Sequence, residues 1–349
     1  DYGFNGSPRQ LINPERLKTV FLQMLHEAHC EVLLYTFVCE PIMDGNRITG
    51  VIIENKPGRQ AIFAKVIIDS TGDGDIAAKA GAAYVKGRET DGAMQPASLM
   101  FKIGGVDYSR AVFPGKFEDY IQIPKGEIQA LGKSHLPFPA GHVLLYRSTL
   151  PGVVTCNMTN CTGIDGTNAA DLSRAVLVCR NQLQPILDFL HEFVPGYENC
   201  YLLETASLIG VRETRHFKGL ETITEEDIRS SRVFPDWAVT HASFNFDVHN
   251  MTGNGLDATG AQDAFTATSY TIPYGCLVPE KIDGLLLAGR NISGTHMAHA
   301  NYRVMPICAN MGQAAGIAAA LCCKENIQPR VVQISELQKL LLQNGVFPV

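Results

Sequence analysis

The sequence contains no uninterrupted apolar run of the length that crosses a membrane. The longest run of small apolar residues, 307–323, includes Asn310 and Gln313, so we expect a buried helix there. Basic residues are also in the minority, because 29 Lys and Arg stand against 35 Asp and Glu and do not gather in one stretch. A net charge of −6 offers no basic surface to nucleic acid or to an anionic membrane. We therefore expect neither as a partner.

The sequence also lacks a complete set of metal ligands, although it has ten cysteines. Cys156 and Cys161 are the one pair with the spacing of zinc ligands, and no second pair or nearby histidine completes a site. Several other cysteines stand in apolar stretches, where a free thiol behaves as a small hydrophobic group. We expect no metal site, reduced thiols and a cytoplasmic location. A signal peptide is missing and the first residue is Asp1, which favours a fragment or a processed product.

The composition is that of a well-buried α/β protein, with 46% hydrophobic and 18% charged residues. A chain of 349 residues is long for one hydrophobic core, so we expect two domains. The first and last parts share buried strands that end in Gly-containing turns, whereas the middle has short β-like runs and longer helices. We predict an α/β domain formed by 1–94 and 270–349, with a mixed β/α (α+β) substrate domain inserted at 95–269.

The N-terminal part predicts a helix, a strand and a hairpin. Apolar residues recur at helical spacing over 14–28, with Asn13 as a plausible N-cap. Residues 31–38 are typical of a buried strand. The turn 44–46, Asp-Gly-Asn, then predicts a hairpin within 41–54.

A buried strand at 66–69 runs into a Gly-rich turn, 69–75, and then into a helix of small residues. This order is typical of a nucleotide site, but the turn carries three acids and no Lys or Arg. An acid at the carboxyl end of a parallel strand is well placed to accept hydrogen bonds from ribose hydroxyls. Phosphate instead needs backbone N–H groups or a helix N-terminus. The turn therefore predicts the ribose side of a dinucleotide site, with the phosphate cradle elsewhere.

A phosphate cradle is missing from the sequence. The relaxed pattern G-x-G-x-x-[G/A] occurs at 253–258, but the residues that follow, 259–263, give no apolar helical stripe. We interpret this segment as a loop.

Five stretches nevertheless stand in a characteristic order: 66–75 with the helix after it, 210–215, 246–249, 272–275 and 284–316. Together they resemble FAD-dependent oxidoreductases of the glutathione-reductase-like superfamily with two dinucleotide-binding motifs. The resemblance implies FAD as cofactor, a Rossmann-like FAD/NAD(P)-binding domain, and hydride transfer between a small-molecule substrate and flavin N5. That family begins with a βαβ unit carrying G-x-G-x-x-G, which this sequence lacks. The helix at Pro14 would follow that unit in a complete member.

The resemblance also implies cofactor contacts in four places: Val38 near the adenine; Thr71, Gly72 and Asp73 on the adenosine and pyrophosphate side; Gly289, Arg290 and Asn291 at the pyrophosphate and ribityl chain; and Gly312, Gln313, Ala314 and Ala315 at the flavin pyrimidine. The last four would lie at the N-terminal end of the helix after Pro306, where a helix stabilises the negative charge of reduced flavin. The alternative is plain close packing of small residues, and we favour the cofactor interpretation.

The candidate catalytic residues are His296, Arg303, Arg212, Arg215 and His249. His296 matches a family histidine and is the predicted acid or base, since histidine titrates near neutrality. Arg303 is expected to hold a carboxylate or a developing oxyanion, and the other three are pocket candidates from the inserted domain. The alternative for each is a structural polar group that fixes a loop.

Further polar residues of the same stretches are weaker candidates. His299 and Asn301 could act like His296 and Arg303. Glu213 stands between two arginines, so we expect a salt-bridge partner and not a catalyst.

Two rival functions remain open. The first is a truncated flavoprotein that no longer binds FAD and acts as an interaction module. The second is a hydrolase that uses Ser293 with His296, although no G-x-S-x-G elbow surrounds Ser293, because position 291 is Asn. A homo-oligomer is possible under any of these readings.

Overall fold

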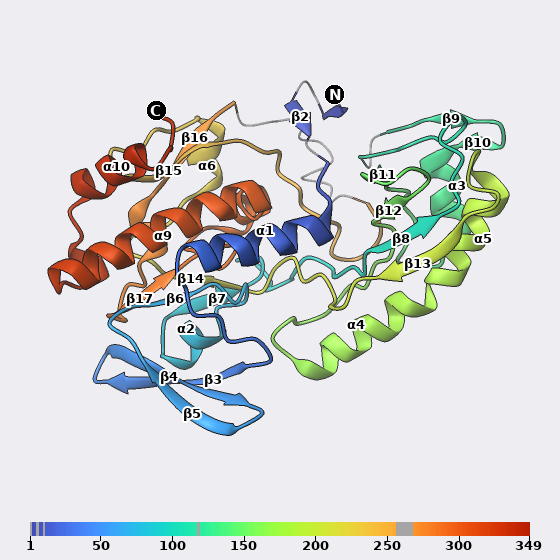
Figure 1. Cartoon of the computed structure of the whole chain (residues 1–349). Coiled ribbons are helices and arrows are strands. Elements are labelled where there is room, and N and C mark those ends of the chain that lie inside the picture. Colours follow the sequence, from blue (N-terminus) through green and yellow to red (C-terminus); the bar gives the residue numbers. More distant parts are fainter. Residues whose placement is uncertain (1, 5–6, 10, 117–118, 256–267) are drawn as a thin grey trace.

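The computed structural model describes residues 2–4, 7–9, 11–116, 119–255 and 268–349. Figure 1 shows two lobes, with the C-terminus in the larger one. Helices and strands occur in both lobes, which confirms the predicted mixed α/β fold.

The chain starts with a short antiparallel pair, β1 (Tyr2–Phe4) and β2 (Ser7–Arg9). Helix α1 (Pro14–Glu27) follows as predicted, and Asn13 caps it by accepting two backbone N–H bonds of 3.1 Å. No side chain of α1 is buried. The helix is therefore held by its own hydrogen bonds and cap, and its apolar face has no cover among the described residues.

The predicted strand at 31–38 is wrong over most of its length. Strand β3 begins only at Phe37 and ends at Asp44, and residues 31–35 are exposed, with Leu34 63% and Tyr35 97% exposed. No described strand pairs with 31–36. Apolar residues alone do not make a strand, because the backbone groups also need a neighbour to bond.

The predicted hairpin is confirmed. Strands β3, β4 (Arg47–Asn55) and β5 (Gly58–Phe63) form an antiparallel sheet in the order β3-β4-β5, and Asp44 pairs with Arg47 across the turn. Gly45 has φ +59°, the left-handed conformation that this tight turn needs.

A parallel pair of strands lies at the centre of the larger lobe. Strand β6 (Ile67–Asp69) pairs with β17 (Leu285–Leu287), so the two ends of the chain build one unit. Every residue of β17 is fully buried. Helix α2 (Asp75–Lys79) follows β6, and the long helix α9 (Met305–Glu325) packs against both strands.

Two antiparallel pairs complete this lobe: β7 (Tyr84–Lys86) with β14 (Arg215–Phe217), and β15 (Trp237–Ala242) with β16 (Tyr270–Pro273). Its remaining elements are α6 (Glu225–Arg229), η1 (Tyr274–Leu277), α8 (His296–Tyr302), η2 (Pro329–Val331) and α10 (Ile334–Gln343). Phe217, Val239 and Phe246 share one hydrophobic core with β17 and α9. Residues of the predicted inserted domain that follow residue 215 thus pack with the terminal segments. The predicted domain boundaries remain a prediction.

The smaller lobe has its own sheet and core. Its antiparallel strands lie in the order β11 (Leu145–Arg147), β12 (Val154–Cys156), β8 (Phe101–Gly104) and β13 (Tyr201–Thr205). Beside them stand β9 (Gln122–Ile123), β10 (Gly126–Glu127), α3 (Ile128–His135), α4 (Ala169–Asn181) and α5 (Leu183–Phe193). Phe101, Leu145 and Leu190 belong to a second hydrophobic core. All ten cysteines of the chain are free thiols.

Helix α9 is buried on one face only, which corrects the expectation of a fully buried helix. Met311 and Ala315 are enclosed, whereas Gly312 and Gly316 on another face are exposed. By length and composition alone α9 is the one helix of the described residues that could cross a membrane, a test that core helices also pass.

A pair of carboxyl groups, Glu221 and Asp236, makes stability depend on pH. Burial and the hydrogen bond with Asp236 raise the pKa of Glu221 from 4.5 to about 7. Between pH 4.5 and pH 7, Glu221 therefore keeps its proton in the folded chain and loses it in the unfolded chain. The stabilisation is complete below pH 4.5 and disappears as the pH rises through 7.

We expect Glu221→Gln to remove this pH dependence. The melting temperature of the unmodified protein relative to the variant should fall as the pH rises from 4.5 to 7, measured by scanning calorimetry. Glu226→Gln, an exposed change on α6, is the control. Parallel curves for the protein and Glu221→Gln would contradict the prediction.

Candidate functional site

The loops after β6 and β17 meet at the carboxyl ends of the two strands, as the sequence predicts. Asn291 Nδ2 donates a hydrogen bond of 3.0 Å to the carbonyl oxygen of Asp69. The Arg290 guanidinium lies 2.8 Å from Oδ1 of Asp73 and crosses directly over Gly72. A side chain at Gly72 would meet this guanidinium at 3.1 Å.

The acids of the turn are bound within the chain. Asp69 is 2% exposed; its Oδ1 accepts from the backbone and hydroxyl of Thr71, and its Oδ2 accepts from the Ala77 N–H at 2.8 Å. Asp69 therefore fixes the turn and starts α2, which corrects the expectation of a ribose acceptor at this position. Asp73 remains part of the loop contact with Arg290.

Bare backbone occurs at one glycine of the loop after β17 and at two glycines of α9. A side chain added at Gly289, Gly312 or Gly316 would meet no atom within 4 Å. Gly289 also has φ +109°, a conformation that other residues rarely adopt. Oδ1 of Asn291 is enclosed and has no partner among the described residues. Open backbone and an unused acceptor fit a flat ligand with polar edges, as a flavin nucleotide is.

The N-terminus of α9 is not where the sequence placed it. The helix starts at Met305, after the N-cap residue Val304, and Pro306 occupies its first turn. Gly312 comes seven residues later, roughly 10 Å along the axis. The free N–H groups of the helix therefore lie near Met305, and the predicted helix end at 312–315 was wrong.

The other predicted cofactor contacts differ in exposure. Ala314 and Ala315 are fully buried, and the Gln313 side chain bonds to the carbonyl of Asn344. Val38 lies in β3 and is 36% exposed. Of the pattern at 253–258, the residues after Gly255 lie outside the described residues.

Three of the predicted catalytic residues gather around Asp247. Arg303 donates to the Asp247 carboxylate at 2.8 Å and to its carbonyl at 2.9 Å, and His249 Nε2 lies 3.4 Å from the same carboxylate. Arg212 binds the neighbouring carbonyl of Pro96 at 2.6 Å. We call Arg212, Asp247, His249 and Arg303 the arginine cluster.

The arginine cluster carries a net positive charge at neutral pH. Burial and the charge of Arg212 lower the pKa of His249 to about 4, so this ring is neutral. Burial would raise the pKa of Asp247, but His249 and Arg303 hold it well below its usual range. Burial and Arg303 lower the pKa of Arg212 to about 10, which leaves it charged. Two guanidinium groups therefore share one carboxylate.

His296 belongs to a second group, centred on Glu213. Oε1 of Glu213 accepts from His216 Nε2 at 2.7 Å and from His296 Nδ1 at 2.6 Å. All three residues are at most 3% exposed. Burial opposes the charge of Glu213, but the bonds from His216 and His296 hold its pKa well below its usual range. We call these three residues the histidine pair with its carboxylate. The partners of Glu213 are thus histidines and not the adjacent arginines.

Gln95 joins the two groups, although it was not among the candidates from the sequence. Its backbone N–H donates to Oε2 of Glu213 at 3.0 Å, and its side-chain Oε1 accepts from the His249 N–H and from Arg303. Its Nε2 is enclosed and has no partner among the described residues. A lone Gln outside any motif gives no sequence signal for such a role.

The ligand atoms of Glu213, His216 and His296 lie within 4.8 Å of one another, close enough to consider a metal ion. The distances favour hydrogen bonds. Metal bonds of about 2.1 Å hold ligand atoms roughly 3 Å or more apart, whereas both nitrogens are 2.6–2.7 Å from Oε1. Nδ1 of His216 is also enclosed without a partner among the described residues, although metal-binding histidines usually have that nitrogen bonded.

Arg215 lies apart from the other candidates. Its guanidinium binds the Asp75 carboxylate at 2.8 Å and the Asp73 carbonyl at 2.9 Å, beneath the ring of Tyr84. It therefore braces the acidic turn. Asn301 accepts from the Tyr270 hydroxyl at 2.6 Å.

His299 and Ser293 are both enclosed. Burial and the neighbouring His216 push the pKa of His299 well below its usual value, so the ring is neutral. The Ser293 hydroxyl bonds to the Thr222 hydroxyl at 2.7 Å and not to His296. Ser293 and His296 thus form no nucleophile–base pair, and the hydrolase reading finds no support.

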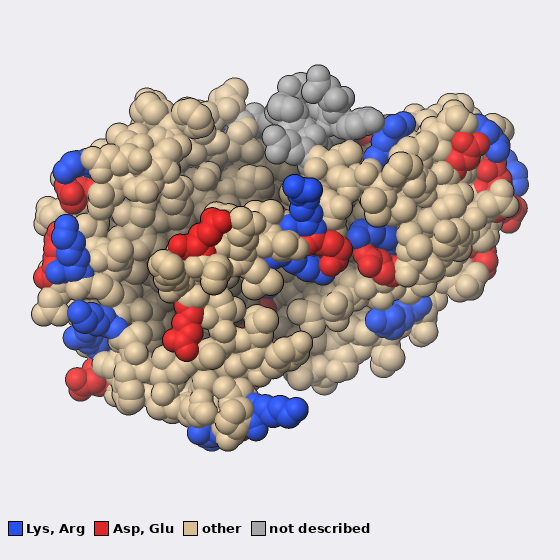
Figure 2. All heavy atoms as spheres, in the orientation of Figure 1, with Lys and Arg blue, Asp and Glu red and all other residues tan. Residues whose placement is uncertain are grey.

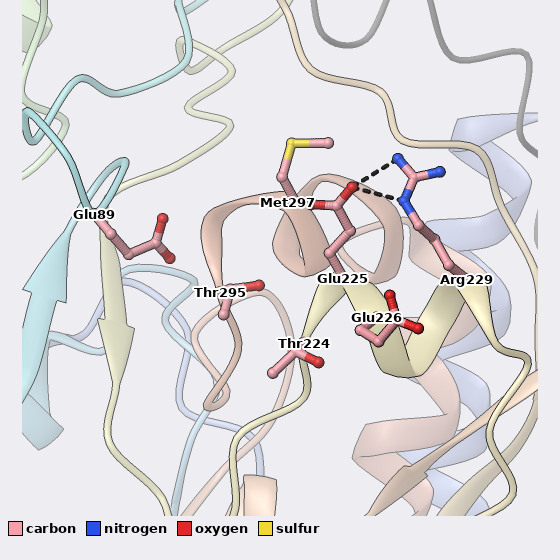
Figure 3. A pocket seen from close by; sticks show the side chains of 7 residues that line it. All are labelled: Glu89, Thr224, Glu225, Glu226, Arg229, Thr295 and Met297. Atoms are coloured by element: carbon pink, nitrogen blue, oxygen red, sulfur yellow. Dashed lines mark hydrogen bonds and ion pairs between the residues drawn. The ribbon is translucent and has the colours of Figure 1, made fainter.

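A surface pocket of about 380 Å³ lies on the other side of this region. Figure 3 shows Thr295 and Met297 on its wall, with Glu225 beside Met297 and paired to Arg229, and Glu89 on the opposite side. His296 is not part of the lining, because its ring points inward to Glu213. The pocket touches this region through Glu89, whose carboxylate accepts the backbone N–H of His296 at 2.8 Å.

Comparison with known proteins defines the class. The chain belongs to the FAD dependent oxidoreductase family, whose pattern matches residues 2–341. This membership indicates FAD as the cofactor. No curated protein matches the chain.

Several solved structures are similar at low identity. They include a geranylgeranyl bacteriochlorophyll reductase-like protein from Thermoplasma acidophilum (TM-score 0.46, 11% identity, 95% of this chain and 59% of that one). They also include p-nitrophenol 4-monooxygenase PnpA from Pseudomonas putida DLL-E4 (TM-score 0.42, 10% identity, 89% and 55%). The chain spans less than two thirds of the length of these proteins.

We expect Asp247→Asn to destabilise the protein by about 3 kcal/mol, because two guanidinium groups lose their shared counter-charge. The Asp247 side chain is 23% exposed, so the expected loss of stability is at the low end of the range for breaking a buried ion pair. Urea unfolding measures it. Glu198→Gln, which removes the exposed partner of Arg110, should cost less than about 1 kcal/mol. Equal costs for both variants would contradict the role of Asp247 as the counter-charge of the arginine cluster.

Proposed function

We propose that the protein transfers a hydride between a small-molecule substrate and N5 of FAD. The observation that carries this proposal is the meeting of the loops after β6 and β17, where Arg290 bridges to Asp73. Family membership supplies the cofactor and the oxidoreductase class. The small-molecule partner, the cytoplasmic location and a possible homo-oligomer, expected from the sequence, belong to the same proposal.

The cofactor would lie along bare backbone. Thr71, Gly72 and Asp73 would face its adenosine side, and Gly289, Arg290 and Asn291 its pyrophosphate and ribityl chain. Bound FAD would supply the hydride acceptor. The N–H groups at the start of α9, near Met305, would then stabilise negative charge on the ring.

The exposed apolar surface of α1 and 31–38 supports a further part of the proposal. Phe21, Met24 and Phe37 are 55–71% exposed, and the surface is hollowed beside α1 in Figure 2. Contiguous apolar surface of this kind marks a contact site. We infer that a βαβ unit with G-x-G-x-x-G, as in glutathione-reductase-like proteins, covers this surface and holds the pyrophosphate.

The gene sequence upstream of Asp1 tests this inference directly. We expect it to encode a strand, a G-x-G-x-x-G turn and a helix in the same reading frame. An upstream stop codon without such a segment would contradict it.

The two polar groups would have different tasks in the reaction, proton exchange and substrate binding. His296 would exchange the proton that accompanies hydride transfer, and the arginine cluster would hold an anionic part of the substrate. The rival reading, an interaction module that has lost FAD, is not favoured, because the family pattern covers nearly the whole chain.

We expect Gly312→Leu to reduce FAD content without unfolding the protein. The change removes a helix-breaking Gly from an exposed position and should stabilise α9 by up to about 1 kcal/mol. The new side chain would occupy the open space in which the proposed cofactor would lie. The flavin absorbance band and the melting temperature of the purified protein measure both effects.

Ala320→Leu provides the matched control, since Ala320 is also exposed on α9 but stands two turns further from Met305. Undiminished flavin content in Gly312→Leu would contradict the placement of FAD. A purified full-length protein with no flavin band would contradict the proposed function itself.

A further inference from the structure

Glu213 has a role beyond charge pairing. We propose that it is a positioning residue that holds His296 with the proton on Nδ1 and leaves Nε2 as the base. The proposal rests on the proposed function, in which His296 exchanges a proton.

The tautomer follows from the chemistry of the bond. Glu213 is held as a carboxylate, and a carboxylate only accepts hydrogen bonds. The nitrogen 2.6 Å from its Oε1 is Nδ1 of His296, so this nitrogen carries a proton. In a neutral ring the lone pair then lies on Nε2.

The carboxylate is itself fixed in orientation. Its Oε1 accepts from both histidines, and its Oε2 accepts from the Gln95 backbone N–H at 3.0 Å. Glu213 is 1% exposed, so water does not compete for these bonds. Three donors on a buried carboxylate hold the His296 ring in one orientation.

The two histidines differ at the ring nitrogen that faces away from Glu213. Nδ1 of His216 is enclosed and without a partner among the described residues. Nε2 of His296 is not among the enclosed atoms, and no described residue bonds to it. His296 also opens α8, directly after the loop that begins at Gly289. We therefore assign the proton exchange to His296 and a supporting role to His216.

The surroundings favour a cationic ring during the reaction. The substrate would lose a proton from an O–H or N–H bond to Nε2, while the hydride and its two electrons pass to FAD. The new positive charge would stand 2.6 Å from the carboxylate of Glu213, which stabilises it. The other titratable groups that face His296 are Glu89, Asp91, His216 and His299.

Nitrogen-15 NMR of histidine-labelled, full-length protein tests the assignment without a substrate. The signal of His296 is identified by its loss in His296→Gln. We expect the neutral form of the His296 ring to carry its proton on Nδ1 and to leave Nε2 bare. A protonated Nε2 with a bare Nδ1 would overturn the proposal.

Glu213→Gln keeps the shape and removes the charge. A hydrogen bond to a neutral oxygen is weaker than one to a carboxylate, so the Nδ1 proton should exchange with water about fivefold faster, the change that about 1 kcal/mol produces. Glu213→Asp keeps the charge and should partly restore the slow exchange. Glu226→Gln on α6 is the control. Equal exchange rates in the unmodified protein and Glu213→Gln would also overturn the proposal.

Flavin absorbance is read on the same samples and separates this inference from the function. A missing flavin band contradicts hydride transfer to FAD but does not alter the tautomer. The wrong tautomer in a yellow protein contradicts the role of Glu213 and leaves the flavin assignment intact.

Discussion

The parallel pairing of β6 with β17 is the contact on which the rest of the structure depends. It brings Asp69 and Asn291, 222 positions apart in the chain, into hydrogen-bond contact. Parallel strands are usually covered on both faces. The three leucines of β17 are fully buried, so this strand is covered on both faces. Because the strands run in the same direction, their loops leave at one edge. The bridge between Arg290 and Asp73 is a consequence of that direction.

Among the buried polar residues near this edge, the hydrogen-bond partners and the neighbouring charges decide which groups stay charged. Carboxylates with several donors, Asp247 and Glu213, remain ionised. Buried imidazoles beside other cationic groups, such as His249 near Arg212 and His299 near His216, lose their charge. The result is a positive region around Arg303 beside a negative one under His296. A substrate that must lose both a hydride and a proton would meet these two environments side by side.

Local features of the structure could be predicted from the sequence, because a cap or a turn involves residues a few positions apart. Asn13 and the 44–46 turn are examples. The strand at 31–38 failed because strand formation depends on a distant partner. The bond between Glu213 and His296 spans 83 positions and leaves no periodicity to detect. Both stretches were recognised, but their contact was not.

Gln95 stands where the chain passes from the larger lobe into the smaller one. Its backbone touches Glu213, and its side chain touches Arg303. A hinge movement of the smaller lobe that shifts this residue would therefore pull on both polar groups at once. Closure over a substrate and the orientation of the base would then be coupled through this one residue.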